Sequence, residues 1–236
     1  MTSPLTYHLN DGIATITLDD GKANAMSPRM LQALGDALTQ AEADQAVVVL
    51  TGRPGMFSGG FDLGIFKAGD VAEQLRMLNA GARITHRLLS FPHPVVAACS
   101  GHAVAMGVFL LLSTDVRIGL TEGAMVHVNE VQIGMTVPHF ALEICRQRLA
   151  PAHLNLATVT AQAYTTVQAL QAGFFDELAP AETLATAALA QATRLKKLNR
   201  AAFTATKLRQ RQAGLAALAI AIEEDAKDWG ARLTAR

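Results

Sequence analysis

The N-terminal part of the chain alternates apolar and polar residues in a way that indicates an edge hairpin. Thr6 to Asn10 precedes Asp11-Gly12, and Ile13 to Leu18 then alternates isoleucine with threonine. Asp-Gly is a preferred turn between antiparallel strands, and a period of two residues turns one face of a strand toward a core. The sequence therefore predicts a β-hairpin that opens a sheet.

The following segment changes to a helical period. Ser27-Pro28 is typical of a helix start, and apolar residues then recur on one helical face as far as Ala41. Val47 to Leu50 is an apolar run with the length of a buried strand. Strand, helix and strand in this order favour a parallel pair joined by a right-handed crossover, and hence an α/β fold.

A glycine-rich loop follows the buried run. Thr51 to Leu63 contains four glycines. Glycine permits sharp turns and a close approach of the backbone to a ligand, so main-chain N–H groups can bind a negative oxygen.

The segment from Val95 to Leu112 repeats this arrangement. It predicts a strand at Val95 to Cys99, a turn at Gly101 and a buried apolar helix from Met106 to Leu112. The unpaired N–H groups and the dipole at a helix N-terminus favour negative charge. Together the two segments predict a pocket that stabilises a negative oxygen.

The remaining pattern is mainly helical. A further short strand is expected at Val116 to Ile118. The other expected helices are Val71 to Leu89, Phe140 to Leu149, Pro151 to Thr160, Thr166 to Ala172, Glu182 to Leu198 and Ala201 to Arg232. A change in character at about residues 175–180 predicts a core of residues 1–178 and a helical C-terminal appendage of residues 179–236.

The composition indicates an ordinary globular chain. Hydrophobic residues make up 50% of the sequence, and twenty Lys and Arg residues balance twenty Asp and Glu residues. Because there is no basic run, we expect no nucleic-acid partner. Cys99 and Cys145 lack metal or redox spacing, which favours reduced thiols and a cytoplasmic location. Neither a signal peptide nor a membrane span is predicted, so no membrane partner is expected.

Four short motifs resemble the signatures of the crotonase superfamily, the enoyl-CoA hydratase/isomerase group. They follow the family's order and spacing, and they are Ala23 to Ser27, Phe57 to Leu63, Gly101 to Gly107 and Asn129 to Gly134. The resemblance covers about residues 5–178. It implies an α/β fold built as a spiral of ββα units, with a helical C-terminal region that forms a homotrimer or a dimer of trimers. It also implies an acyl-CoA thioester substrate, no metal, and no cofactor apart from the CoA of that substrate.

The resemblance also assigns roles to individual residues. The backbone N–H groups of Phe61 and Met106 match the two donors of an oxyanion hole, and such a donor typically contributes about 3 kcal/mol in the transition state. Glu130 stands at the position of a catalytic glutamate. The other positions expected to contact the substrate or its CoA are Ala23, Ala25, Asp62, Leu63 and Phe109.

One departure from the family indicates a particular reaction. Hydratases have a first glutamate three residues beyond the second oxyanion donor, where this chain has Phe109. Adding water benefits from two carboxylates, whereas moving a double bond needs one. The pattern is therefore most similar to single-glutamate isomerases that convert 3-enoyl-CoA into trans-2-enoyl-CoA. The alternatives are an enoyl-CoA hydratase, another thioester reaction of the family, and a non-catalytic CoA-binding protein.

Other polar residues near the motifs have simpler explanations. Asp62 is also expected to cap neighbouring N–H groups, as a carboxylate in a glycine-rich loop commonly does. Glu143 is a rival carboxylate that we expect to pair with Arg146 or Gln147. Three histidines that flank the expected site are more typical of hydrogen-bonding residues than of acids or bases, namely His102, His127 and His139.

Overall fold

The N-terminal hairpin opens the larger of two sheets. The computed structural model describes residues 3–234, and in it β1 (Leu5–Asn10) and β2 (Ile13–Leu18) pair antiparallel. Asp11 and Gly12 both have positive φ in the turn. A type I′ turn requires positive φ at both central residues, which Asp-Gly supplies. The predicted hairpin is confirmed.

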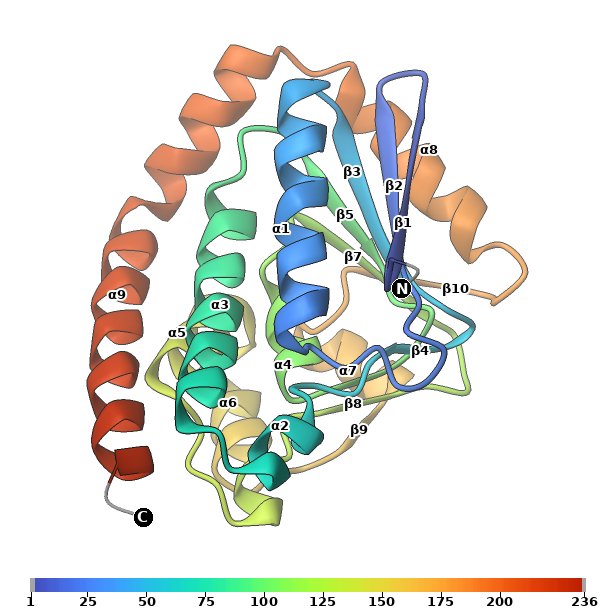
Figure 1. Ribbon diagram of the computed structural model, residues 1–236. Helices are drawn as coiled ribbons and strands as arrows, with labels where there is room; N and C mark the ends of the chain where they lie inside the picture. The colour runs from blue at the N-terminus through green and yellow to red at the C-terminus, as the bar shows by residue number, and fades with distance from the viewer. Residues whose placement is uncertain (1–2, 235–236) are drawn as a thin grey trace.

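Parallel strands extend this sheet (Figure 1). Helix α1 (Pro28–Ala43) leads from β2 to β3 (Val47–Gly52), and the two strands pair in parallel as predicted. The sheet continues through β5 (Val95–Ala98), β7 (Val116–Leu120) and β10 (Glu177–Ala179), in the order β1-β2-β3-β5-β7-β10. The apolar run of β3 is uninterrupted because helices cover both faces of this sheet.

The smaller sheet is not predicted by the sequence pattern. Its strands, in spatial order, are β4 (Gly55–Ser58), β6 (Gly101–Val104), β8 (Met125–His127) and β9 (Tyr164–Thr165). Each of β4 and β6 follows a strand of the larger sheet and precedes a helix, which agrees with a spiral of ββα units. The predicted turn at Gly101 is wrong. Gly101 begins β6, where its lack of a side chain permits pairing with β4, since a Cβ there would overlap the Gly55 backbone.

The helices lie close to where the periodicity predicts them. The exception is α2 (Leu63–Ala68), a short helix that was not expected. The others are α3 (Val71–Ser90), α4 (Met106–Leu112), α5 (His139–Arg148), α6 (Pro151–Thr158), α7 (Thr166–Ala172), α8 (Leu184–Lys196) and α9 (Arg200–Thr234). Within residues 3–234, no helix has both the length and the apolar character needed to cross a bilayer.

The larger sheet has a core on each face. Val49 and Val96 point to one side, where they pack with Ala188 of α8. Val48 and Leu50 belong to the larger core on the other side, which also includes buried residues of α1, α3, α4 and α5. Alternating side chains of each strand therefore supply two cores.

The C-terminal helices pack directly on the rest of the molecule. Helix α8 contacts β3, β5 and β7, and α9 runs beside α3 and α5 (Figure 1). The boundary predicted after residue 178 falls inside β10. The division into a core and an appendage, and a role of the appendage in trimers, stay predictions.

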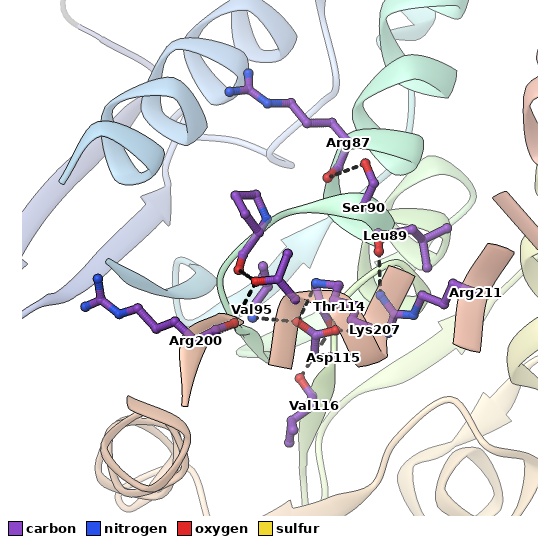
Figure 2. Close-up of polar contacts among 12 residues, drawn as sticks. Arg87, Leu89, Ser90, Val95, Thr114, Asp115, Val116, Arg200, Lys207 and Arg211 are labelled. Atoms are coloured by element: carbon purple, nitrogen blue, oxygen red, sulfur yellow. Dashed lines mark hydrogen bonds and ion pairs between the residues drawn. The ribbon is translucent and has the colours of Figure 1, made fainter. Parts of the chain in front are cut away.

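A buried ion cluster fastens α9 to the larger sheet (Figure 2). Asp115, which lies just before β7, accepts hydrogen bonds from the Val95 N–H and from Lys207 Nζ, each at 2.8 Å, and pairs with Arg211 at 2.9 Å. Arg211 also donates to the Leu89 carbonyl at 2.7 Å. The three charged side chains are at most 11% exposed. Burial, which disfavours the charged form, lowers the pKa of Lys207 to about 8.

We expect Asp115→Asn to lower the free energy of unfolding by about 3–5 kcal/mol, because two buried cations would lose their counter-charge. Urea denaturation measures this change. Asp11→Asn is the control, since it breaks an ion pair with Lys196 in which the Asp11 side chain is 83% exposed. That control should cost less than about 1 kcal/mol. Similar losses for both variants would contradict the importance of the buried cluster.

Candidate active site

The loop before α1 is held together by the Asp20 carboxylate. It accepts hydrogen bonds from the N–H groups of Lys22 at 2.7 Å, Asn24 at 2.8 Å and Ala25 at 2.9 Å. Burial by itself would raise the pKa of Asp20, but the backbone N–H groups outweigh it and lower the pKa below its usual value. The loop is therefore fixed by its own acidic side chain.

Asn24 connects this loop to the first glycine loop. It is fully buried with a φ of 50°, and its side-chain amide donates to the Met56 carbonyl at 3.1 Å and the Phe57 carbonyl at 3.2 Å. Its own carbonyl accepts the Ser58 hydroxyl at 2.8 Å, and Ser58 Oγ accepts the Gly60 N–H at 3.2 Å. This role of Asn24 was not predicted from the sequence. The available signal was an asparagine in a loop, because this residue type tolerates positive φ.

Ala23 and Ala25, which are predicted to hold CoA, lie half-buried in this loop. The Ala23 carbonyl accepts the Gly59 N–H at 2.8 Å. The Ala25 N–H donates to Asp20, and the Ala25 carbonyl accepts the Ser27 N–H at 2.8 Å. Three of their four backbone polar groups thus order the loop, and their contact with CoA stays a prediction.

The two predicted oxyanion donors lie on loops that touch at Gly60. Gly60 has a φ of 96°, and a Cβ there would lie 2.9 Å from Ala105 Cβ and 3.5 Å from the Met106 nitrogen. Phe61 follows Gly60 directly, so the residue before the first predicted donor lies close to the nitrogen of the second. Among the described residues, neither of these two N–H groups has a hydrogen-bond acceptor.

Ala105 sets the start of α4 between these loops. Its φ of 49° is unusual for a residue with a side chain, and α4 has no side-chain cap. The Ala105 N–H donates to the His127 carbonyl at 2.9 Å, which ties the strained residue to β8. Met106 is then the first residue of α4, where an N–H has no acceptor within the helix. This leaves the Met106 N–H available to a ligand, as the oxyanion prediction requires.

Phe61 and Glu130 line the same pocket. The pocket has a volume of about 430 Å³ and lies between the first glycine loop, α2, α3, α9 and the segment 130–138. Its walls are formed by Phe61, Leu63, Phe66, Leu78, Glu130, Ile133, Gly134, Met135, Thr136, Pro138 and Trp229. Within the described part of the chain, Glu130 is the only titratable residue in these walls. The pocket is otherwise largely apolar.

Glu130 is held at a tight turn with its side chain buried. It precedes the short 3₁₀ helix η1 (Val131–Ile133), which Gly134 ends with a φ of 79°. The Glu130 carbonyl accepts the N–H groups of Ile133 at 3.1 Å and Met135 at 2.8 Å. Oε2 of Glu130 is buried and has no hydrogen-bond partner among the described residues. Burial raises the pKa of Glu130 to about 7, which suits a general base near neutral pH.

Phe109 lies behind the pocket and not in its wall. It is 1% exposed and packs edge-on against Phe140, with ring centroids 5.6 Å apart. Phe140 in turn packs edge-on against Trp229 at 6.3 Å, and Trp229 lines the pocket. Phe109 therefore supports the pocket through a second ring, and its predicted contact with substrate stays a prediction.

The other predicted site residues take different positions. Asp62 accepts the Gly64 N–H at 2.8 Å and caps α2, as its capping role predicts. Leu63 lines the pocket and is 54% exposed. The Met106 side chain is fully buried. The substrate contacts assigned to Asp62 and Leu63 stay predictions.

The other candidate acids and bases near the motifs, which are Glu143 and three histidines, have partners outside the pocket. Glu143 pairs with Gln147 at 2.9 Å and with Arg146 at 3.6 Å, as expected. The walls of the 430 Å³ pocket contain no histidine among the described residues. The histidine partners are the Met125 N–H for His102, the Ala161 carbonyl for His127, and Glu224 and Asp228 for His139.

Trp229 and Gly81 belong to the site but were not predicted from the sequence. Trp229 is the only tryptophan in the chain, and a single large aromatic residue in a mostly polar helix was the available signal. Gly81 gave no such signal, because its role comes from the Phe61 ring packed against it.

Comparison with known proteins identifies the family. The family model described as enoyl-CoA hydratase/isomerase matches residues 8–230. The chain therefore belongs to the enoyl-CoA hydratase/isomerase family, and the crotonase-type fold expected from the sequence is confirmed.

Solved structures from Mycobacterium tuberculosis are similar along nearly the whole chain. One is described as a probable enoyl-CoA hydratase, with 43% identity, a TM-score of 0.93 and coverage of 96% of each chain. Another is described as an apo enoyl-CoA isomerase, with 42% identity, a TM-score of 0.92, and coverage of 96% of this chain and 99% of that one.

Curated relatives match over shorter stretches. A probable enoyl-CoA hydratase of Bacillus subtilis is 33% identical over 132 residues, which cover 55% of this chain. The chain spans about half the length of that relative. A peroxisomal enoyl-CoA delta isomerase of Arabidopsis thaliana is 26% identical over 70% of this chain and 71% of its own length. Similar proteins thus carry both hydratase and isomerase names.

Gly81 of α3 should be intolerant of a side chain. A Cβ at Gly81 would lie 2.6 Å from the Phe61 ring, so we expect Gly81→Ala to lower the free energy of unfolding by about 1–3 kcal/mol through overpacking. Gly35→Ala in α1 is the matched control, because its Cβ would meet only Ile84 Cδ1 at 3.8 Å. The control should gain about 0.5–1 kcal/mol from helix propensity. Thermal unfolding measures the stability of both variants. If Gly81→Ala stabilised the protein as much as Gly35→Ala does, the close contact of Gly81 with the Phe61 ring would be refuted.

Glu130 should destabilise the fold at neutral and higher pH. Its pKa is raised from 4.5 to about 7, so between these pH values the folded protein binds more protons than the unfolded chain, and the free energy of unfolding falls as pH rises. We expect Glu130→Gln to be more stable than the unsubstituted protein by about 3 kcal/mol at about pH 8, and about equal to it below about pH 4.

Urea denaturation across this pH range measures the difference. Glu143→Gln is the control, since Glu143 has partners and lies outside the pocket. If the free energies of unfolding of Glu130→Gln and of the unsubstituted protein differed by the same amount at every pH, burial would not raise the pKa of Glu130.

Proposed function

We propose that the protein is an enoyl-CoA isomerase that converts 3-enoyl-CoA into trans-2-enoyl-CoA, with Glu130 as the residue that moves the proton. The observation that carries this proposal is the isolation of Glu130. Among the described residues it is the single titratable group in the pocket walls, and its Oε2 has no partner. The likeness to a mycobacterial protein described as an enoyl-CoA isomerase supports the proposal.

The chemistry needs one group that accepts a proton and returns it. The Glu130 carboxylate removes a proton from C2 of the substrate, and the electron pair of that C–H bond enters a dienolate. The dienolate oxygen accepts hydrogen bonds from the N–H groups of Phe61 and Met106, which stabilise the charge as it forms. Glu130 then delivers the proton to C4, so the double bond moves from C3–C4 to C2–C3 and the mass is unchanged.

The apolar walls assist this transfer. A pocket wall of phenylalanine, leucine and tryptophan excludes water, which would otherwise protonate the intermediate. The same burial raises the pKa of Glu130 toward neutrality, so the carboxylate can both take and return the proton.

Hydration is the second candidate, because several similar proteins are described as probable enoyl-CoA hydratases. Adding water benefits from a second carboxylate. The position where the family resemblance puts that carboxylate is Phe109, which is buried behind Phe140. We therefore favour isomerisation.

The proposal extends to partners and location. Proton transfer between carbon atoms requires no redox group or metal, so we propose that the CoA of the substrate is the sole non-protein group. We also propose a homotrimer or a dimer of trimers in the cytoplasm, as the resemblance implies. Nucleic acid is not an expected partner, given the balanced charge.

Incubation with 3-hexenoyl-CoA tests the reaction directly. We expect a product of unchanged mass with the absorbance of a conjugated enoyl thioester, and a rate that falls below about pH 7 as Glu130 becomes protonated. Glu130→Gln should lower kcat by about 10²–10⁴-fold, while Glu143→Gln should retain the rate. Water gain by 2-hexenoyl-CoA without isomerisation would favour the hydratase, and an unchanged rate in Glu130→Gln would exclude the proposed mechanism.

A further inference from the structure

Helix α9 supplies part of the wall of the pocket that contains Glu130. In the described part of α9, Trp229 is the residue that lines this pocket, and it is partly buried there. Phe61 and Glu130 line the same pocket from the other segments. The remaining apolar walls of the pocket, Trp229 among them, are available to the acyl chain of a thioester held at Phe61 with its C2 at Glu130.

Trp229 is backed by two further rings and has little freedom to move away. It packs edge-on on Phe140 at 6.3 Å and 76°, and Phe140 packs edge-on on the buried Phe109 at 5.6 Å and 81°. Edge-to-face aromatic pairs of this kind are favoured beyond the burial of their apolar area. An acyl chain that reaches Trp229 therefore meets a supported wall.

Asp225 fixes the position of this part of α9. It is 2% exposed and accepts the N–H groups of His139 at 2.9 Å and Phe140 at 2.8 Å. These are the first two residues of α5, whose N-cap Pro138 has no side-chain cap. Asp225 thus acts as the missing cap from a distant helix.

The two residues act together because of their spacing. Asp225 and Trp229 are four residues apart, so they share one face of α9. The hydrogen bonds of Asp225 hold this face against α5, beside Pro138, which also lines the pocket. The Asp225 carboxylate therefore links the two parts of the pocket wall that Trp229 and Pro138 form.

We infer that Trp229 limits the length of the acyl chain that the pocket accepts, and that Asp225 is the positioning residue that holds it. This inference rests on the proposed binding of acyl-CoA thioesters in this pocket. It assigns chain-length selection to α9, whereas the proton transfer stays with Glu130.

Trp229 itself provides the probe, because it is the only tryptophan in the chain. The intact protein is titrated with butanoyl-, octanoyl- and dodecanoyl-CoA, which bind without reacting, and calorimetry measures binding in parallel. We expect the tryptophan emission to change more with octanoyl- than with butanoyl-CoA, because only the longer chain reaches the ring. Binding without any change in emission for any of the three would overturn the inference and leave the proposed isomerase untouched.

Substitution of Trp229 tests whether this residue selects for acyl-chain length. We expect Trp229→Ala to raise the ratio of kcat/KM for 3-dodecenoyl-CoA over 3-hexenoyl-CoA by about tenfold or more, since space for even one methylene group changes specificity on this scale. Phe203→Ala removes a ring elsewhere on α9, and it should leave the ratio unchanged. An unchanged ratio in Trp229→Ala would overturn the inference.

The role of Asp225 is tested with a variant of the same size. Asp225→Asn should change the ratio in the same direction as Trp229→Ala, mainly through KM, and should shift the tryptophan emission of the ligand-free protein. Glu224→Gln is the control, because the Glu224 side chain is 53% exposed beside it. A fall in kcat for both substrates with no change in their ratio would overturn the positioning role.

The outcomes separate this inference from the proposed reaction. If the tryptophan emission depended on acyl-chain length but 3-enoyl-CoA was not isomerised, the role of Trp229 would be supported and the proposed isomerase activity would be overturned. Absence of acyl-CoA binding by calorimetry would overturn both.

Discussion

The parallel pairing of β4 with β6 is the contact on which the site depends. Parallel strands end at the same edge of a sheet, so the residues that follow Ser58 and Val104 are delivered to one place. Those residues are the two loops that carry Phe61 and Met106. The pairing is possible because Gly101 has no side chain to separate the two backbones. A second close approach, of Gly60 to Ala105, then brings the loops into contact.

Much of this arrangement was predictable from the sequence, and the exceptions share a physical cause. The hairpin, α1 and the buried α4 have strong local signals in turn chemistry and apolar period. Strands β4, β6, β8 and β9 span only two to four residues each, which is too short for a period to be visible. Glu130 was found by its motif, but the lack of a partner for its Oε2 depends on folded neighbours. Trp229 and Asp225 act through long-range contacts that no local pattern encodes.

Two buried carboxylates differ in their surroundings, and this difference distinguishes a structural residue from a candidate catalytic one. Asp115 accepts hydrogen bonds from a backbone N–H and a lysine and pairs with an arginine, so its charge is fully compensated. Glu130 lies in an apolar wall with one oxygen unpaired. The first arrangement stabilises the charged form and fixes a helix. The second arrangement leaves the charge of Glu130 uncompensated, and the packing of the rest of the molecule offsets the free energy that this costs.

The position of Trp229 has a consequence for how the protein is made. The pocket joins Phe61 to Trp229 of α9, which is synthesised long after it. Domains generally fold as units during synthesis, and α9 packs on the same core as the two sheets and α3. The part of the pocket wall that Trp229 supplies cannot form until α9 has docked on α3 and α5. The pocket is therefore complete only once α9 has been made, and shorter, partly synthesised chains lack the part of the wall that Trp229 supplies beside Glu130.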